Sequence, residues 1–382
     1  ERNKTLQAEL FPHSISRQLE DQDLDLLDYQ VRGDATVQLL LTNEALETHY
    51  VNRFSLLAAR HPAGTRLFPS ETNSLVIIGD IQSPSSAVSR DGRDVLSLVK
   101  CPDSLAYRTD IAQFPLLAER GEHDWVECSV TVPEGTRRLK ILLRLRNTLL
   151  STTLFYDVVL ASQGIDALNW NHRMNNDETY AAQFRRVYDA FSGIAVSIHQ
   201  DGKWVKHSTI RDVGPITWKY VATEIPVKQT GEVHVRLSSF PDNVAIDYVG
   251  FSFDKEETDG IQIEEISAKQ IFDNTGTERD DIISDLLFDD ERYLVTNPGD
   301  SYRLQFNVKA QEASELTLFV SSKGYYTEWI RGSWLRVPNA AYRFDLSDTQ
   351  GTLSWLVKSW LQSKDEMEQK FFQSRIPIRR QR

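Results

Sequence analysis

The most regular part of the sequence is residues 193–254, which read GIAVSIHQDGKWVKHSTIRDVGPITWKYVATEIPVKQTGEVHVRLSSFPDNVAIDYVGFSFD. Val233, Val235 and Leu237 alternate with polar residues, as in a β-strand that has one face in a core and one in water. Turn-forming pairs such as Asp201-Gly202 and Gly214-Pro215 separate this run from its neighbours. The segment therefore predicts a series of antiparallel strands.

The last of these strands changes phase within its length. Val244 and Ile246 share one face, but the following apolar residues fall at positions 249, 251 and 253. A β-bulge near Asp247-Tyr248, or burial of both faces, produces such a slip. Because Asp247 lies among apolar residues, we expect it to be partly buried and to accept hydrogen bonds from neighbouring turns.

Two further strands are predicted before this segment, at residues 125–132 and 138–146, with the turn Pro133-Glu134-Gly135 between them. The second carries a row of cationic residues on one face: Arg138, Lys140, Arg144 and Arg146. The row has two interpretations. Its charges either protect an exposed sheet or meet an acidic segment or an acidic ligand.

The strands between residues 123 and 254, among them GEVHVRLSS and NVAIDYVGFSF, resemble the jelly-roll sandwiches of galactose-binding-like and carbohydrate-binding modules. This resemblance implies a non-catalytic domain on an exported protein. It rests on the strand pattern, so it assigns no ligand-binding residue. The chain departs from the simplest such sandwich at residues 177–191, where Tyr180, Phe184 and Val187 repeat at helical spacing.

We predict a mainly β fold, all-β to α+β, built from antiparallel β-sandwich units with an inserted helix and a long C-terminal amphipathic helix. Three units are expected. They are residues 1–122, an N-terminal β-rich unit with a leading helical arm; residues 123–275, the jelly-roll-like sandwich with the inserted helix 177–191; and residues 276–382, a strand pair, an aromatic loop and the closing helix.

The overall charge bears on the class of partner. The 382 residues include 43 basic and 55 acidic side chains, which gives a net charge of -12. Such a charge repels phosphate groups and argues against nucleic acid or an anionic membrane as the main partner. No apolar run is long enough for a transmembrane helix. The chain opens Glu1-Arg2-Asn3, and we expect a processed product from which a signal peptide, an anchor or further domains were removed.

The cysteines and catalytic motifs add little. Cys101 and Cys128 either form one disulfide, which would contribute about 3 kcal/mol in an oxidising compartment, or remain free thiols. No Cys/His spacing indicates a metal site, and we expect no cofactor. The sequence contains no GxSxG, GxxxxGK, HExxH or EF-hand pattern. A glycosidase-type carboxylate pair remains open, but the sequence does not locate it.

The most unusual segment is residues 323–336, KGYYTEWIRGSWLR. Aromatic rings combined with arginines are typical of recognition surfaces, because rings stack on sugars and guanidinium groups give directed hydrogen bonds. The segment supplies the candidate ligand-binding residues Tyr325, Tyr326, Trp329, Arg331, Trp334 and Arg336. The alternative is a hairpin whose rings anchor the closing helix through Trp355 and Trp360.

Three functions follow from these observations. The first is a non-catalytic structural or interaction protein, part of an exported component in the extracellular, cell-surface or periplasmic space, with a protein partner. The second is a glycan-binding module that uses the aromatic loop 323–336. The third is a carbohydrate-active hydrolase with an unlocated carboxylate pair. The sequence leans away from an enzyme.

Overall fold

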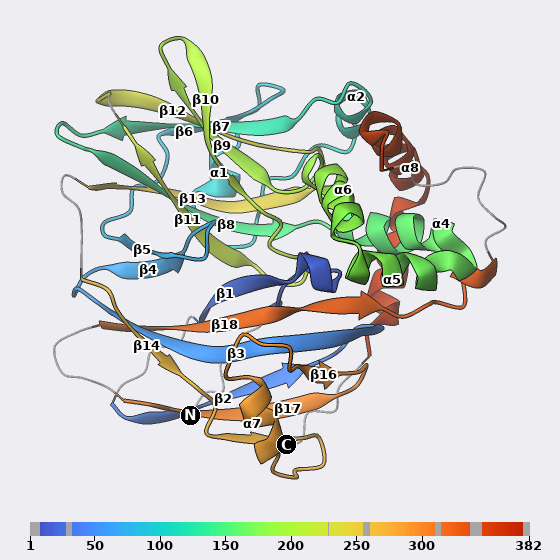
Figure 1. Cartoon of the computed structure of the whole chain (residues 1–382). Coiled ribbons are helices and arrows are strands. Elements are labelled where there is room, and N and C mark those ends of the chain that lie inside the picture. The colour runs from blue at the N-terminus through green and yellow to red at the C-terminus, as the bar shows by residue number, and fades with distance from the viewer. Residues whose placement is uncertain are drawn as a thin grey trace.

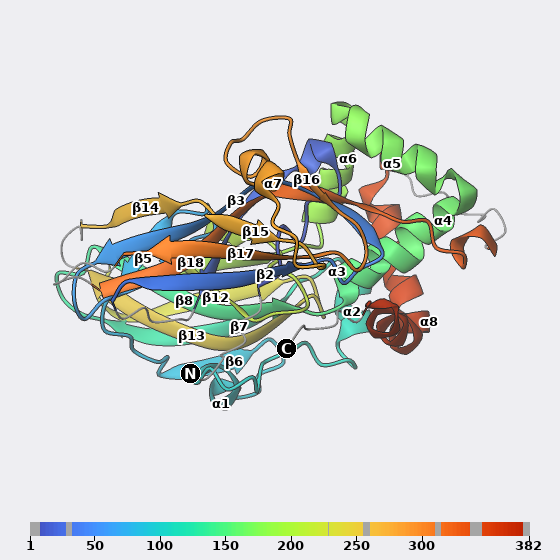
Figure 2. The ribbon, with the colours of Figure 1, turned by 90° about the horizontal axis from the view of Figure 1, so that it is seen from below.

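The computed structural model describes residues 8–27, 33–227, 229–254, 260–309, 315–336 and 346–376. In these residues the chain is mainly β, as predicted, with antiparallel sheets layered on one another and the helices gathered at one end (Figures 1 and 2). None of the described helices combines the length and the apolarity that a membrane crossing requires. The first seven residues, where the chain was expected to be processed, lie outside the described ranges.

One sandwich is built from the two ends of the sequence. Its core contains Leu56, Phe306 and Leu318, which are completely buried. The first sheet has the order β1 (Asp21–Leu27), β18 (Glu315–Glu328), β3 (Glu47–His61) and β14 (Gln262–Ile266), and β16 (Leu294–Thr296) also pairs with β3. The second sheet has the order β15 (Gln270–Phe272), β17 (Ser301–Val308) and β2 (Ala35–Thr42).

The central part of the chain forms a second sandwich above the first (Figure 1). Its inward-facing residues, such as Ile141, Val235 and Phe251, are completely buried. One sheet has the order β10 (Lys203–Ile210), β9 (Ile194–Gln200), β12 (Gly231–Ser239), β7 (Asp124–Val132) and β6 (Ser86–Ser89). The other has the order β11 (Lys219–Pro226), β8 (Arg138–Asn147) and β13 (Val244–Asp254).

The predicted phase slip in the last central strand is a register shift. The pairing of β13 with β8 is interrupted between Ile246 and Tyr248. Asp247 at this point is completely buried, accepts a hydrogen bond from the backbone N–H of Ser104 at 2.5 Å and pairs with Arg144. The bulge and the structural role expected for this carboxylate are both confirmed.

Helices close one end of both sandwiches. The layer begins with α2 (Phe114–Glu119), α3 (Leu150–Thr153), the π-helix η2 (Leu154–Leu160), α4 (Ala161–Gln163) and η3 (Gly164–Asp166), and continues with α5 (Ala167–Asn176), α6 (Glu178–Asp189), η4 (Trp334–Arg336) and α8 (Thr349–Ser374). The predicted helix at 177–191 is α6, and Asp177 caps it by accepting the N–H of Tyr180 at 3.0 Å. The predicted closing helix is α8, which is tied to the central sandwich because the Trp360 indole donates to Asp242 at 3.1 Å.

The remaining short elements are η1 (Arg17–Leu19), β4 (Arg66–Pro69), β5 (Leu75–Ile78), α1 (Leu96–Val99) and α7 (Asp280–Asp285). The leading helical arm is therefore wrong, since residues 17–19 form one 3-10 turn and residues 21–27 form β1. Ile15 and Leu19 are four residues apart, as on one face of a helix, and this spacing suggested the arm. The residues that follow them instead pair with β18 as a strand. The predicted C-terminal strand pair is also wrong, because β17 and β18 lie in different sheets.

The division into residues 1–122, 123–275 and 276–382 stays a prediction. The strand pairing nevertheless shows how its first and last parts are connected. β18, near the end of the chain, pairs on one side with β1 and on the other with β3. The central sandwich is consequently flanked in sequence by the two halves of the outer one.

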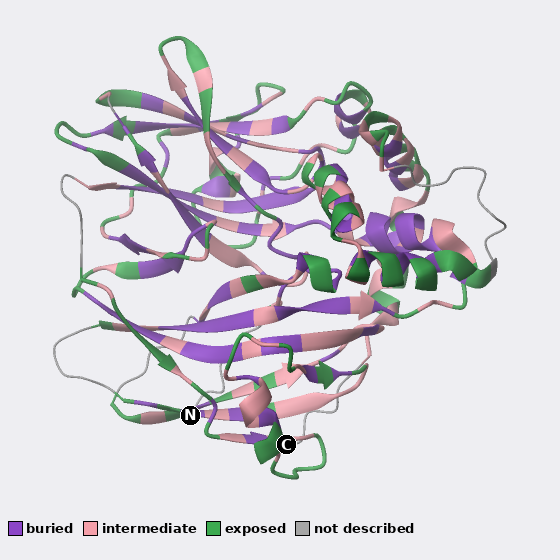
Figure 3. Ribbon diagram, viewed as in Figure 1, coloured by how far each residue is buried: buried purple, intermediate pink, exposed green. Residues whose placement is uncertain are grey.

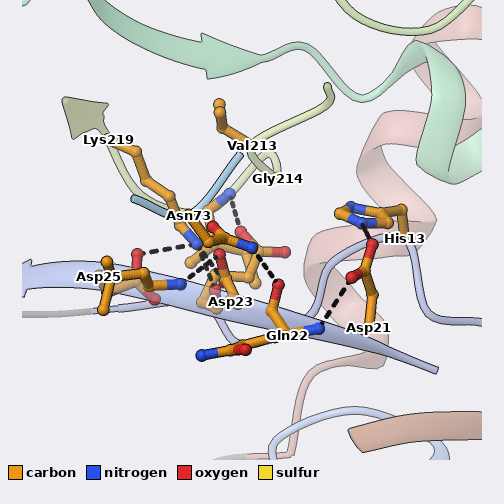
Figure 4. A network of polar contacts seen from close by, with 12 residues as sticks. His13, Asp21, Gln22, Asp23, Asp25, Asn73, Val213, Gly214 and Lys219 are labelled. Atoms are coloured by element: carbon orange, nitrogen blue, oxygen red, sulfur yellow. Dashed lines mark hydrogen bonds and ion pairs between the residues drawn. The ribbon is translucent and has the colours of Figure 1, made fainter. Parts of the chain in front are cut away.

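A polar network joins β1 of the outer sandwich to β11 of the central one (Figure 4). The Lys219 ammonium lies 2.7 Å from Asp23 and 2.8 Å from Asp25, and it donates to the carbonyl of Glu9 at 2.7 Å. Burial, together with the charge of Asp23, raises the pKa of Asp25 to about 7, and burial raises the pKa of Glu9 to about 7. Two carboxyl groups and a main-chain carbonyl therefore surround one lysine at this junction, and the Glu9 carboxyl group accepts the N–H of Ile216 at 2.9 Å.

Candidate functional site

The alternation of side chains at the paired ends of β3 and β18 creates two different surfaces. In this register Glu328 faces Glu47, Thr327 faces Thr48, Tyr326 faces His49 and Tyr325 faces Tyr50. Because successive strand residues point to opposite faces, the pairs alternate between the two faces of the sheet. The predicted aromatic loop thus begins as the end of a strand.

The first surface is a hollow of about 390 Å³, which we call the Trp329 hollow. It lies where α5 approaches the ends of β3 and β18 (Figure 1). Its lining combines two aromatic rings, two threonines, an amide and two aliphatic side chains. The lining residues are Thr48, Tyr50, Leu168, Asn171, Thr327, Glu328, Trp329 and Ile330.

Trp329 is held in place at the edge of this hollow. Its side chain is 45% exposed, yet its indole N–H donates to the Thr48 hydroxyl at 2.9 Å and its backbone N–H donates to Leu46 at 2.9 Å. The amide of Asn171 donates to the carbonyl of Glu328 at 3.2 Å, which joins α5 to the same strand end. The ring is therefore both accessible and fixed, so little side-chain entropy remains to be lost when it binds a ligand.

A tyrosine cluster continues the aromatic surface away from the hollow. The rings of Tyr50 and Tyr325 are stacked, with centroids 4.5 Å apart and an interplanar angle of 9°. Tyr293 meets both rings edge to face, at 6.2 Å and 5.6 Å. Only Tyr50 of these three lines the hollow, while Tyr325 is buried by its neighbours.

The second surface, on the side of the helical layer, is a buried acidic cluster. The carboxyl groups of Glu47 and Glu328 are buried on residues that lie opposite each other, so a proton on one of them is favoured over two charges. Burial raises the pKa of Glu47, and burial together with the neighbouring Glu47 raises the pKa of Glu328 well above its usual range. His49 lies 2.6 Å from Glu47, and burial lowers its pKa to about 4, so it is neutral at pH 7.

Arg331 and Tyr156 complete this acidic cluster. The Arg331 guanidinium lies 3.4 Å from Glu328 and 4.8 Å above the ring of Tyr156. Tyr156, on the π-helix η2, lies beside the carboxyl pair, and burial raises the pKa of its hydroxyl well above the usual range. Such π-helical turns are frequent at functional sites, but here Tyr156 places a neutral hydroxyl beside buried carboxyl groups.

The geometry of the carboxyl pair bears on the hydrolase hypothesis. Glycosidases hold their two carboxyl groups about 5 Å apart or more, on either side of the scissile bond. Glu47 and Glu328 instead lie opposite each other in the register of β3 and β18, and Glu328 is only 2% exposed at its side chain. This pair supports the strand ends from behind, while the accessible chemistry belongs to the Trp329 hollow.

The structure separates the residues predicted from the aromatic segment. Trp329 is exposed at the hollow, Tyr325 lies in the tyrosine cluster, and Tyr326 and Arg331 belong to the acidic cluster. Trp334 is 1% exposed and belongs to the same core as Trp360 of α8, but the hairpin of the anchoring alternative does not form, because the segment is the end of β18 followed by η4. Arg336 ends η4, and its side chain lies outside the description.

The remaining hollow residues escaped the sequence analysis. Thr48 and Tyr50 lie in the first half of β3, and no motif in the sequence singled out either residue. Leu168 and Asn171 lie on α5, a helix that was not predicted. The Leu168 side chain is 64% exposed, and the outer surface of α5 is open to solvent (Figure 3).

Of the two alternatives for the cysteines, the structure shows free thiols at both Cys101 and Cys128. Cys101 is exposed on a loop, whereas Cys128 is buried in the central core. A second cavity, between η1, η2 and α6, measures about 30 Å³, room for about one water molecule. Within the described ranges, no three His, Cys, Asp or Glu side chains converge as a metal site requires.

Comparison with known proteins gives little. No family model matches the chain, and no curated protein matches it. Among solved structures, the GH31 alpha-xylosidase from Xanthomonas citri aligns with 79% of this chain and 25% of its own, at 9% identity and a TM-score of 0.18. The chain thus spans about a quarter of that protein, and a likeness at this TM-score supports no conclusion on fold or function.

Proposed function

We propose that the chain is a non-catalytic binding protein, part of an exported cell-surface or envelope component, and that it binds a glycan in the Trp329 hollow. The single observation that carries the proposal is the fixed, accessible indole of Trp329 beside the hydroxyl groups of Thr48 and Thr327. Sugars present an apolar C–H face and a rim of hydroxyl groups. A ring to stack on, with hydroxyl and amide partners close by, suits that chemistry.

The size and shape of the hollow support a short glycan segment. Its volume of about 390 Å³ falls in the range of small-molecule sites, and it opens to solvent beside the exposed surface of α5. Tyr50 at its border carries the aromatic surface on to Tyr325 and Tyr293. A chain of sugar units could therefore extend along the sheet from the Trp329 ring.

A protein partner is the second candidate. It is favoured by the apolar side chains beside the hollow, where Ile165 is 75%, Leu168 is 64% and Leu335 is 56% exposed. η3 and η4, which carry Ile165 and Leu335, lie against each other. Exposed apolar groups in one place are typical of protein contacts. The hydrolase alternative has less support from this pair, because Glu47 and Glu328 are both buried, whereas a glycosidase places its carboxyl groups on either side of a bound substrate.

The experiment is a glycan-array screen of the purified chain, followed by calorimetric titration with each glycan that binds. Trp329→Ala should weaken binding by about tenfold or more, which corresponds to about 1.4 kcal/mol. Thr48→Val keeps the shape but removes the indole's acceptor, so it should weaken binding less. Trp204→Ala, in β10 of the central sandwich, serves as the control and should bind normally.

The outcomes separate the candidates. Binding that depends on Trp329 supports the glycan site. Binding that is unchanged by Trp329→Ala contradicts this site, and an array without any bound glycan contradicts the glycan proposal. In the second case, a protein captured from source envelope by the wild type and lost with Leu168→Asp would support the partner alternative.

A further inference from the structure

The cationic side chains on β8 have different partners at the two ends of the row. Arg138 pairs with Glu224 at 3.1 Å, and Lys140 lies 3.4 Å from the same carboxylate and also contacts Asp254. These two side chains are matched by the protein's own acidic residues, as one interpretation of the sequence predicted. The other end of the row, at Arg144 and Arg146, lies in a different environment.

Two arginines lie over one tryptophan at that end, and a third, Arg108, follows Tyr107, which pairs with Ile246 of β13. The guanidinium groups of Arg144 and Arg146 lie 5.1 Å and 4.8 Å from the ring of Trp218, the residue that precedes β11. Arg108, on the adjoining loop, is close enough that it contributes, after burial, to lowering the pKa of Arg146. The ring braces the two strand-borne cations by cation–π contact and leaves their N–H groups to bond elsewhere.

The positive charge of this cluster is only partly matched. Asp247 pairs with Arg144, but neither Arg108 nor Arg146 forms an ion pair with any residue in the ranges that the structure describes. The Nε atom of Arg146 is buried and has no hydrogen-bond partner. In a chain with a net charge of -12, two adjacent arginines without a carboxylate are conspicuous. A buried guanidinium donor without an acceptor costs free energy unless a ligand completes it.

The cluster is also held rigidly. Arg144 and Arg146 project from a central strand, paired on one side with β11 and on the other with β13. The adjoining loop is fixed because the Ser104 N–H donates to Asp247 at 2.5 Å, and Ser104 has a φ of 73° in the left-handed region. A non-glycine residue is kept in that conformation only where its surroundings enforce it. The guanidinium groups of Arg144 and Arg146 are therefore positioned before any ligand arrives.

We propose that Arg108, Arg144 and Arg146, braced by Trp218, form a binding site for the oxyanion group of an acidic ligand. The planar fork of a guanidinium group bonds two oxygens of a carboxylate, sulfate or phosphate at once. Unpaired arginines side by side can bond one such group together. This site lies on the central sandwich and does not depend on the proposed function of the Trp329 hollow.

The test is a calorimetric titration of the whole chain with sodium sulfate, sodium phosphate and sodium glucuronate, at a constant ionic strength set with sodium chloride. Saturable binding of at least one of these anions is expected, and the anion that binds best identifies the source of the group. Arg146→Gln and Arg108→Gln should each weaken it by about tenfold or more. Arg146→Lys keeps the charge but loses the fork, so it should bind with intermediate affinity.

Arg303→Gln is the matched control, because this exposed arginine also lies over an aromatic ring, 5.1 Å from the centre of Phe272. It should bind the anion like the wild type, as should Trp329→Ala. Arg108 is exposed, so its variant is expected to fold even if Arg146→Gln does not. The proposal is overturned if no anion shows saturable binding, if Arg108→Gln binds as well as the wild type, or if the control loses as much affinity.

Discussion

Glu47 and Glu328 face each other directly across β3 and β18, and both carboxyl groups are buried. Like charges opposite each other in a sheet destabilise it, so the arrangement is stable only while one group keeps its proton. Arg331 and Tyr156 support the remaining charge. This acidic cluster lies directly behind the strand ends that carry Thr48, Thr327 and Trp329.

The proton retained by the Glu47 and Glu328 pair predicts a pH dependence of stability. The raised pKa values of Glu47 and Glu328 mean that the folded state binds more protons than the unfolded state above the ordinary carboxyl pKa of about 4.3. Their contribution to the free energy of unfolding should therefore fall as the pH rises from there towards the folded-state pKa. The side-chain amide of the Glu328→Gln variant does not titrate. The free energy of unfolding of this variant should therefore change less steeply with pH, as measured by urea unfolding between pH 5 and pH 8.

Glu264→Gln, on the exposed edge strand β14, is the control for this measurement and should keep the wild-type slope. If the free energy of unfolding of Glu328→Gln depends on pH as steeply as that of the wild type, the pair does not retain a proton in the folded state.

The junction in Figure 4 predicts a different response. Lys219→Met leaves Asp23 and Asp25 without their cation and should lower the free energy of unfolding by about 3–5 kcal/mol at pH 8. The loss should be smaller at pH 5, because Asp25 and Glu9, with pKa values of about 7, then take up protons and lose their charge. Denaturant unfolding at the two pH values measures the difference.

Lys370→Met offers a comparison, because its partner Glu366 is on the exposed face of α8. It should leave stability unchanged within error at both pH values. Equal losses for Lys219→Met at pH 5 and pH 8 would contradict the assignment of charge at the junction.

The two tryptophans of the aromatic segment should differ in their contribution to stability. Trp334 is 1% exposed, and Trp334→Ala should cost about 3–5 kcal/mol through the cavity that it leaves. Trp329 is 45% exposed, so Trp329→Ala should cost about 1 kcal/mol or less, mostly the lost bond to Thr48. Thermal and urea unfolding measure both values. A larger loss for Trp329→Ala would mean that its ring is a packing residue.

The thiols provide a fourth prediction. Cys101 is exposed and should react with iodoacetamide in the native protein, whereas Cys128 should react only after unfolding. Burial raises the pKa of Cys128 to about 12, which removes the reactive thiolate at neutral pH. Mass spectrometry of alkylated peptides distinguishes the two sites. Native protein without any labelled Cys101, but labelled after reduction, would indicate that the two cysteines are bridged.

Local patterns in the sequence predicted the elements whose physical cause is local. The alternation around Val235 predicted a central strand, the shifted phase predicted the bulge at Asp247, and the spacing of Tyr180 and Phe184 predicted α6. In each case the signal lies within about ten residues of the feature that it predicts.

The candidate site depends on contacts that no local pattern contains. Trp329 and Thr48 are separated by 281 positions, and their hydrogen bond follows from the pairing of β18 with β3. The aromatic segment was recognised as unusual, but its division into exposed and buried rings depends on strand alternation and on α5. The helical spacing of Ile15 and Leu19 was misleading, because β18 offered the following residues a strand partner.

The most direct test of the glycan site uses the protein labelled with 5-fluorotryptophan and fluorine NMR. The eight tryptophans should give separate resonances, and the one missing from Trp329→Phe belongs to Trp329. We predict that a glycan selected from the array shifts the Trp329 resonance in a saturable way and leaves those of the buried Trp334 and Trp360 in place. A glycan that binds while the Trp329 resonance stays unchanged would contradict the proposed site.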